Sequence, residues 1–201
     1  RWHRDMDVAV NPEEATNWDN YDVTKVLDQG DFMDIKVAPD GRLFYITRGQ
    51  DIVGTGGTGK TTFYIAALNP DTGEETTVLE KETRNGTSGS GEVDTPSRET
   101  GGQSIAFDPN FEENDRIYVL YHPQFDEMDD IGGSPYGEVD RFGYMLLSRF
   151  ELTSEAIDPD SETEILRIPQ QYDACCHHGA NLEFDPDGNL YVSVGDNSEI
   201  V

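Results

Sequence analysis

The sequence is poor in positive charge. Lys and Arg together number 14, against 41 Asp and Glu, and the formal net charge is −27 at pH 7. A field this negative repels nucleic acid and anionic lipid surfaces, so we expect no nucleic-acid partner. The acidic residues are spread along the whole chain, which favours a halophilic protein whose carboxylate surface keeps it hydrated at high salt. A calcium-loaded secreted protein is the competing interpretation of this composition.

Long apolar runs are absent too. No stretch reaches the roughly 18 apolar residues that a membrane-spanning helix needs, so we expect no transmembrane segment. A helical apolar period does not persist over any window of about a dozen residues, which argues against a long helix. Hydrophobic residues nevertheless make up 35% of the chain and aromatic residues 10%. These fractions predict a folded chain with a core, because an acidic disordered tail would contain far fewer of them.

Cysteine occurs only twice, at the adjacent positions Cys175 and Cys176, and His177 and His178 follow directly. Consecutive residues of an extended segment point alternately to opposite sides, and zinc sites are usually built on spaced pairs, so we expect no metal here. A vicinal disulfide, which suits an oxidising compartment, and two buried thiols are both compatible with the pair. The tripeptide NGT at Asn85 is a candidate glycosylation site in a polar loop of a secreted protein.

A repeated pattern of strands runs along the chain. Three segments share an alternating strand, a Pro-centred turn and a second alternating strand, and their marker prolines are Pro39, Pro109 and Pro186. Pro presets one turn dihedral and Gly allows positive φ, so Pro-Asp-Gly between two such strands predicts a hairpin. The middle copy has a longer turn, from Asn110 to Asp115. Each repeat therefore begins with a hairpin.

Further strands are expected between these hairpins, at 62–68, 75–79, 144–152 and 163–168. Four short strands per repeat favour an all-β fold, a β-propeller of four-stranded blades, over a sandwich whose hairpins merely look alike. On this interpretation residues 1–29 are a lead-in segment and residues 30–201 supply about the first three blades of an expected six. Three blades would leave open edges, so we expect the remaining blades in a longer gene product or in a partner chain.

The stretch VGTGGTGKTTF, which begins at Val53, matches the phosphate-binding loop of nucleotide hydrolases at every position of that motif. Such a loop holds phosphate only where a helix begins directly after its Lys-Thr pair. Here the β-branched and aromatic run TFYIAAL, residues 62–68, follows, and it predicts a strand that ends in a turn. We therefore expect a connection between two strands, and no nucleotide at Gly54–Thr61.

The stretch from His177 to Asp196 carries a specific resemblance to a known family. Its sequence, HHGANLEFDPDGNLYVSVGD, resembles the His-to-Asp motif of the soluble quinoprotein sugar dehydrogenases, the glucose/sorbosone dehydrogenase family. Upstream, GQSIAFDPNF from Gly102 is similar to a second segment of that family. A branch of the family carries Cys-Cys directly before the motif's His, as this chain does. The resemblance runs from about Gly30 to the C-terminus, and Ala180 departs from it by replacing a Gly.

The resemblance implies a propeller that uses pyrroloquinoline quinone (PQQ) and calcium to oxidise a sugar or related alcohol, at an extracellular or cell-surface location. It places the general base at His177, which would take a proton from the substrate hydroxyl. It places Gln103 where the family has a polar residue facing the cofactor, and His178 behind the base or on the surface. Most of the family's cofactor ligands would fall beyond Val201.

Two other functions compete with this one. A non-catalytic surface propeller would bind glycans or a protein partner and retain the histidine for structure, and a structural part of a surface assembly is a third interpretation. The acidic clusters Asp126–Asp130 and Asp158–Glu164 lack the oxygen spacing and central Gly of a calcium loop. We therefore expect them to be solvated surface.

Overall fold

The computed structural model describes residues 32–49, 60–84, 100–123, 142–154, 156–171 and 177–196. Its strands are β1 (Phe32–Val37), β2 (Leu43–Thr47), β3 (Lys60–Leu68), β4 (Glu75–Arg84), β5 (Gly102–Phe107), β6 (Arg116–Tyr121), β7 (Phe142–Leu152), β8 (Ile157–Gln171), β9 (Ala180–Phe184) and β10 (Leu190–Val194). The only helix in these ranges is a single turn, α1 (Phe111–Asn114). No helix in these ranges is long and apolar enough to cross a membrane.

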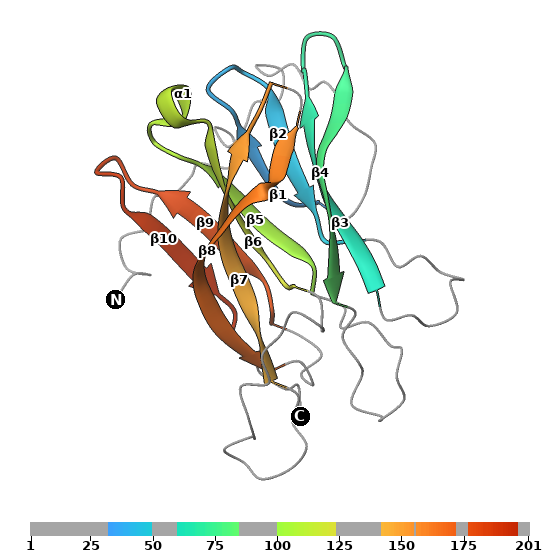
Figure 1. Cartoon of the computed structure of the whole chain (residues 1–201), viewed down its shortest axis with the longest axis vertical. Helices are drawn as coiled ribbons and strands as arrows, with labels where there is room; N and C mark the ends of the chain where they lie inside the picture. The colour runs from blue at the N-terminus through green and yellow to red at the C-terminus, as the bar shows by residue number, and fades with distance from the viewer. Residues whose placement is uncertain are drawn as a thin grey trace, which may run out of the picture.

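The strands form two four-stranded antiparallel sheets and one separate hairpin (Figure 1). Sheet 1 has the strand order β1-β2-β3-β4, sheet 2 has the order β5-β6-β7-β8, and the hairpin pairs β9 with β10. Strands that follow each other in the chain are neighbours in the sheet, which is the up-and-down arrangement of a propeller blade. The all-β prediction and the prediction of four strands per repeat are confirmed in both complete sheets. The described part of the third repeat contains its first two strands.

The predicted turns join the first two strands of each repeat. Gly41 and Gly188 have φ of +88° and +84°, the left-handed conformation that glycine adopts without strain. The longer turn of the middle copy contains α1, and Asp115 ends this helix with a φ of 52°. The N–H of Asp115 donates to the Phe111 carbonyl at 2.8 Å. The hairpin that begins each repeat is therefore present in all three copies, although one turn is enlarged.

The four strands predicted between the hairpins all extend further in the structure. β8 includes Pro159 and Pro169, whereas the predicted strand ended at Ile168. β8 is the outermost strand of sheet 2, and an edge strand tolerates proline because one row of its N–H groups has no ladder partner. β3 begins at Lys60, so a strand and not a helix follows the glycine-rich tract, as predicted. Residues 50–59 of that tract lie outside the described part of the chain.

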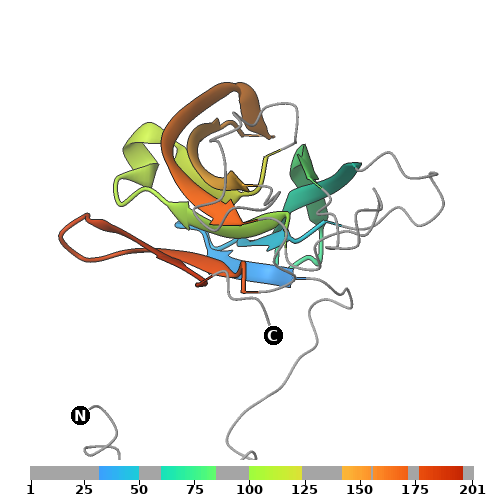
Figure 2. The ribbon, with the colours of Figure 1, turned by 90° about the horizontal axis from the view of Figure 1, so that it is seen from below.

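Apolar side chains fill the space between neighbouring sheets. Figure 2 shows the sheets fanning out from β1, β5 and β9. Sheets 1 and 2 enclose one core, whose buried members include Phe44, Ile46, Phe63, Ile105, Ile117 and Tyr121. Sheet 2 and the hairpin enclose a second core, with Ala106, Leu120, Met145, Leu147 and Leu182 buried. Sheet 2 therefore buries both of its faces, as a blade with a neighbour on each side does.

A polar side chain lies five residues before each marker proline, on the first strand of the repeat. These equivalent residues are Asp34, Ser104 and Asn181. The Ser104 hydroxyl donates to Asp34 Oδ2, lies 3.0 Å from Asn181 Oδ1, and accepts from the N–H of Leu182 at 2.9 Å. One hydrogen-bonded group thus joins β1, β5 and β9 and fixes how the three sheets are aligned.

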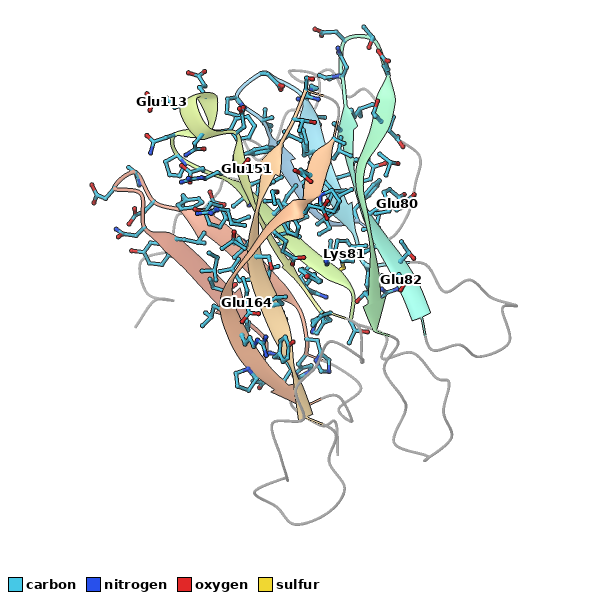
Figure 3. All side chains as sticks on the ribbon, in the orientation of Figure 1. Glu80, Lys81, Glu82, Glu113, Glu151 and Glu164 are labelled. Atoms are coloured by element: carbon cyan, nitrogen blue, oxygen red, sulfur yellow. The ribbon has the colours of Figure 1, made fainter. Side chains whose placement is uncertain are left out.

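The outer strands of the two sheets are joined by an ion pair, the Lys81–Glu162 clamp. Lys81 of β4 faces sheet 2 (Figure 3), and its Nζ lies 2.7 Å from a carboxylate oxygen of Glu162 on β8. The hydroxyls of Tyr121 and Ser148 donate to the other oxygen of Glu162 at 2.5 and 2.7 Å. Burial alone would raise the pKa of Glu162, but these three hydrogen bonds together lower it below its ordinary value.

Candidate active site

The two ends of the sheets differ in their connections. At one end, which is uppermost in Figure 1, the strands are joined by short turns at 38–42, 69–74, 108–115, 153–156 and 185–189. The connections at the other end are at 48–59, 85–101, 122–141 and 172–179, and the first three are longer than any of these turns. Gln103, His177 and Asp196 all lie at this second end, which we call the site end. Ligand-binding residues commonly lie on such connections, held by a rigid scaffold.

His177 lies directly before β9, and its side chain is exposed. Its Nδ1 is 2.7 Å from Oδ1 of Asp196, which lies just after β10. The two side chains are 46% and 71% exposed. A carboxylate oxygen only accepts hydrogen bonds, so Nδ1 carries the proton of the neutral imidazole and Nε2 carries the lone pair. A lone pair on the ring of a partly exposed imidazole is what a general base needs in order to take a proton from a hydroxyl group.

The backbone at His177 has an uncommon conformation. Its φ is +68°, in the left-handed region that few residues other than glycine adopt. Gly195 packs against this turn, because a Cβ at Gly195 would lie 1.8 Å from the His177 carbonyl oxygen. The N–H of Gly195 donates to the Gly179 carbonyl at 2.8 Å. The pairing of β9 with β10 and the absence of a side chain at Gly195 therefore bring His177 and Asp196 together.

His178 points the opposite way from His177 and is fully buried. Its Nδ1 lies 3.2 Å from Oε1 of Gln170, near the end of β8. Its ring packs edge-on against His122, with 5.9 Å between the ring centroids. The sequence left open whether His178 lies behind the base or on the surface, and the structure places it in the interior.

His122 follows β6 and is also fully buried. Its N–H donates to the Gly101 carbonyl at 2.9 Å, and the hydroxyl of Thr83, in β4, donates to its carbonyl. Gly101 in turn has a φ of +120° and packs so closely on sheet 1 that a Cβ there would lie 1.6 Å from the Arg48 carbonyl oxygen. His122 therefore ties the site ends of sheets 1 and 2 together.

Gln103 occupies a β-bulge of β5. The register of β5 against β6 shifts between Gly102 and Ser104, so Gln103 is the extra residue of the bulge. Its side chain is fully buried. Met33 lies at a similar register shift in β1. Gln103 thus lies at the same end of the sheets as His177 but in the interior, and its contact with a cofactor stays a prediction.

Several predicted positions lie outside the described residues: Asn85, Cys175, Cys176 and the cluster Asp126–Asp130. Within the ranges that the structure describes, no group of three or more His, Cys, Asp and Glu side chains is arranged to hold a metal ion. The second acidic cluster, Asp158–Glu164, lies on β8. Asp158 and Asp160 are exposed there, whereas Glu162 belongs to the clamp between the sheets.

A family comparison agrees with the motif at the site. The family model for glucose/sorbosone dehydrogenase matches residues 33–200. The chain belongs to the glucose/sorbosone dehydrogenase family. The family named from the sequence is therefore confirmed, whereas the Cys-Cys branch and the halophilic origin stay predictions.

One solved structure shows the same fold over most of this chain. The PQQ-bound aldose sugar dehydrogenase from Streptomyces coelicolor is similar to this chain, with 17% sequence identity and a TM-score of 0.53. The similarity covers 86% of this chain and 40% of that chain, so the chain spans less than half of the length of this relative. A candidate 6-phosphogluconolactonase from Bacteroides uniformis has 14% identity over 80% of this chain and 63% of its own, with a TM-score of 0.20, too low for a comparison of folds.

Three residues of the site end received no role from the sequence. Asp196 closes the quoted motif, and the pairing of β9 with β10 would have placed it beside His177. Gln170 and His122 carry no such signal, because no motif of neighbouring residues marks their contacts with His178.

Proposed function

We propose that the chain is part of a PQQ-dependent dehydrogenase that oxidises a sugar or related alcohol, with His177 as the general base. The observation that carries this proposal is the His177–Asp196 pair, in which Nδ1 of His177 is hydrogen-bonded and the His177 side chain is 46% exposed. Membership of the family supports the reaction class. The PQQ-bound relative supports the choice of cofactor.

The described residues fit one side of such a site. His177 presents an exposed imidazole, as a base that must reach a bound substrate requires. The bulge at Gln103 places a second polar group at the same end of the sheets. PQQ carries carboxylates, which cationic side chains and calcium would hold. We propose that the rest of the propeller supplies most of these ligands.

The chain's own part in the reaction is the movement of one proton. The chemistry that the quinone supplies when bound is the two-electron oxidation of the substrate carbon. His177 Nε2 accepts the hydroxyl proton of the substrate as the carbonyl group forms. Asp196 keeps the proton on Nδ1, so the tautomer is correct before the reaction, and its charge stabilises the imidazolium afterwards.

We also propose that the remaining blades pack against sheet 1. The equivalent residues four positions before the marker prolines are Ile35, Ile105 and Leu182. Ile105 and Leu182 are fully buried against the preceding sheet, whereas Ile35 is 56% exposed on the outer face of sheet 1. A further sheet on this face would give Ile35 the environment of its two equivalents. We place the assembled protein outside the cell or on its surface.

The test is reconstitution of the complete propeller with PQQ and calcium. We expect absorbance of bound quinone after removal of excess cofactor, and reduction of an electron-accepting dye that depends on an added aldose. Omission of the quinone or of the aldose provides the controls. Cofactor binding without turnover on any aldose contradicts the proposed substrate class, and absence of cofactor binding favours a non-catalytic, glycan- or protein-binding propeller.

A further inference from the structure

Two adjacent histidines lie in opposite environments. His177 is exposed at the site end, whereas His178 is fully buried between sheet 2 and the hairpin. The left-handed backbone at His177 separates the two directions. Because the two residues are adjacent, a contact that holds the His178 ring in place also restrains the backbone of His177.

The exposed pair is too weak to hold that backbone by itself. The side chains of His177 and Asp196 are 46% and 71% exposed, and an exposed polar contact contributes little to stability because water and salt screen it. A left-handed φ at a residue other than glycine is unfavourable and persists only where the surroundings impose it. The restraint must therefore come from buried contacts next to His177.

The buried contacts of His178 come from residues at the end of sheet 2. Gln170, which is 1% exposed, lies near the end of β8, and its Oε1 is 3.2 Å from Nδ1 of His178. Because Oε1 accepts, Nδ1 of His178 carries the proton. The ring of His122 packs edge-on against His178, and His122 is held by Gly101 and Thr83. The turn before β9 is thus fastened to the end of β8 by a hydrogen bond that water does not reach.

We propose that His178 and Gln170 are positioning residues for His177, and this inference rests on the proposed role of His177 as base. Their buried hydrogen bond holds the turn so that Nδ1 of His177 meets Asp196 and Nε2 faces the site. Loss of the bond lets the backbone at His177 relax from its left-handed conformation. The exposed ring then loses its alignment while the sheets stay folded.

The experiment compares H178A with H178N and Q170A. Asn at this position keeps an N–H donor one bond beyond Cγ, where Nδ1 of His lies, so H178N should retain the bond to Gln170. One measurement is made on the 201-residue chain by NMR: the amide-to-α coupling of His177 reports its φ, and the ring ¹⁵N shifts report its tautomer. We expect both to change in H178A and Q170A and to stay unchanged in H178N.

The second measurement is turnover in the complete, cofactor-loaded propeller. We expect kcat to fall roughly 10- to 100-fold in H178A and Q170A with little change in KM, because a base displaced by about 1 Å loses rate and not substrate binding. H178N should restore most of kcat. The H178A/Q170A double variant should lose no more than either single variant, because both remove the same bond.

The inference is overturned if H178A and Q170A lower the melting temperature but leave the φ and tautomer of His177 unchanged. It is also overturned if H178N fails to restore them while remaining folded. Unchanged turnover in H177A would instead refute the proposed function. The NMR result on the backbone would stand in that case, so the two failures can be told apart.

Discussion

At the scale of single residues, the site depends on contacts on each side of one imidazole. Asp196 accepts from Nδ1 of His177, and Gly195 leaves room for the His177 carbonyl where any side chain would collide with it. Asp196 and Gly195 are adjacent, so the end of β10 supplies both contacts. The end of the second strand of the hairpin therefore contacts the proposed general base on one side, and the buried His178–Gln170 bond holds the turn on the other.

Replacement of Asp196 by Asn should lower kcat about tenfold. A hydrogen bond to a charged group contributes about 1.5–3 kcal/mol, and the exposure of this pair places the effect at the low end of that range. The side-chain amide of Asn can donate as well as accept, so it no longer keeps the His177 imidazole in one tautomer. The measurement is dye-linked turnover of the complete, cofactor-loaded protein.

D187N is the matched control for D196N. It makes the same chemical change in an exposed residue at the short-turn end of the same hairpin, far from His177. We expect unchanged turnover. Equal losses in both variants would show that charge alone, and not the contact with His177, determines the effect.

At the scale of elements, much of the architecture could be predicted from the sequence. The Pro-Asp-Gly turns and the alternating strands predicted the hairpins at β1–β2 and β9–β10, because turn geometry is encoded locally. The middle hairpin, β5–β6, was predicted from the same repeated pattern, although its turn has no Pro-Asp-Gly sequence. The continuation of β8 through Pro159 and Pro169 could not be predicted, because it depends on that strand lying at the edge of the sheet.

The site was predictable only in part, for the same reason. His177 follows from a motif of consecutive residues. The burial of His178 and its contacts with Gln170 and His122 depend on how sheet 2 packs against the hairpin, and no local pattern encodes that packing. The burial of Gln103 depends on a bulge that one sequence does not show.

The Lys81–Glu162 clamp gives a prediction at this scale. E162Q should lower the free energy of unfolding at neutral pH by about 1 kcal/mol, because the carboxylate accepts charge-assisted hydrogen bonds in a half-buried position. The folded-state pKa of Glu162 is lowered, so its contribution is complete above the ordinary value of 4.5 and is lost as the pH falls through the lower folded value. The difference between wild type and E162Q in urea unfolding should therefore shrink at acid pH.

E164Q provides the control for this measurement. Glu164 lies on the same strand, and its exposed carboxylate pairs with Arg167 at 2.7 Å. Exposed pairs contribute little, so we expect a change below about 0.5 kcal/mol at any pH. A difference for E162Q that persists or grows in acid would contradict the role given to the clamp.

At the scale of the whole molecule, the two complete sheets differ in how their faces are covered. Sheet 2 has a neighbour on each face, whereas sheet 1 leaves Ile35 and Val37 exposed on its outer face. The chain spans 40% of the solved aldose sugar dehydrogenase that it resembles. We have proposed that another sheet covers this face.

Replacement of Ile35 by Ser tests that proposal. In the complete propeller it should lower the free energy of unfolding by about 1.5–3 kcal/mol, because an apolar side chain that is buried there becomes polar. In the 201-residue chain the effect should be small, since Ile35 is already 56% exposed. I105S is the control. Ile105 is already buried in the 201-residue chain, so this substitution should destabilise both the chain and the complete propeller. The same small effect of I35S in both proteins would contradict the proposed covering sheet.

The central claim is that His177 acts as the base in a PQQ-dependent oxidation, and the turnover of H177A in the complete, cofactor-loaded propeller tests it most directly. Absorbance of the bound quinone and an unchanged melting temperature would establish that the variant is folded and loaded. We predict that dye reduction with an aldose falls by at least about 100-fold, since general base catalysis contributes roughly 10²- to 10⁴-fold. Turnover equal to that of the wild type, with the quinone bound, would contradict the account.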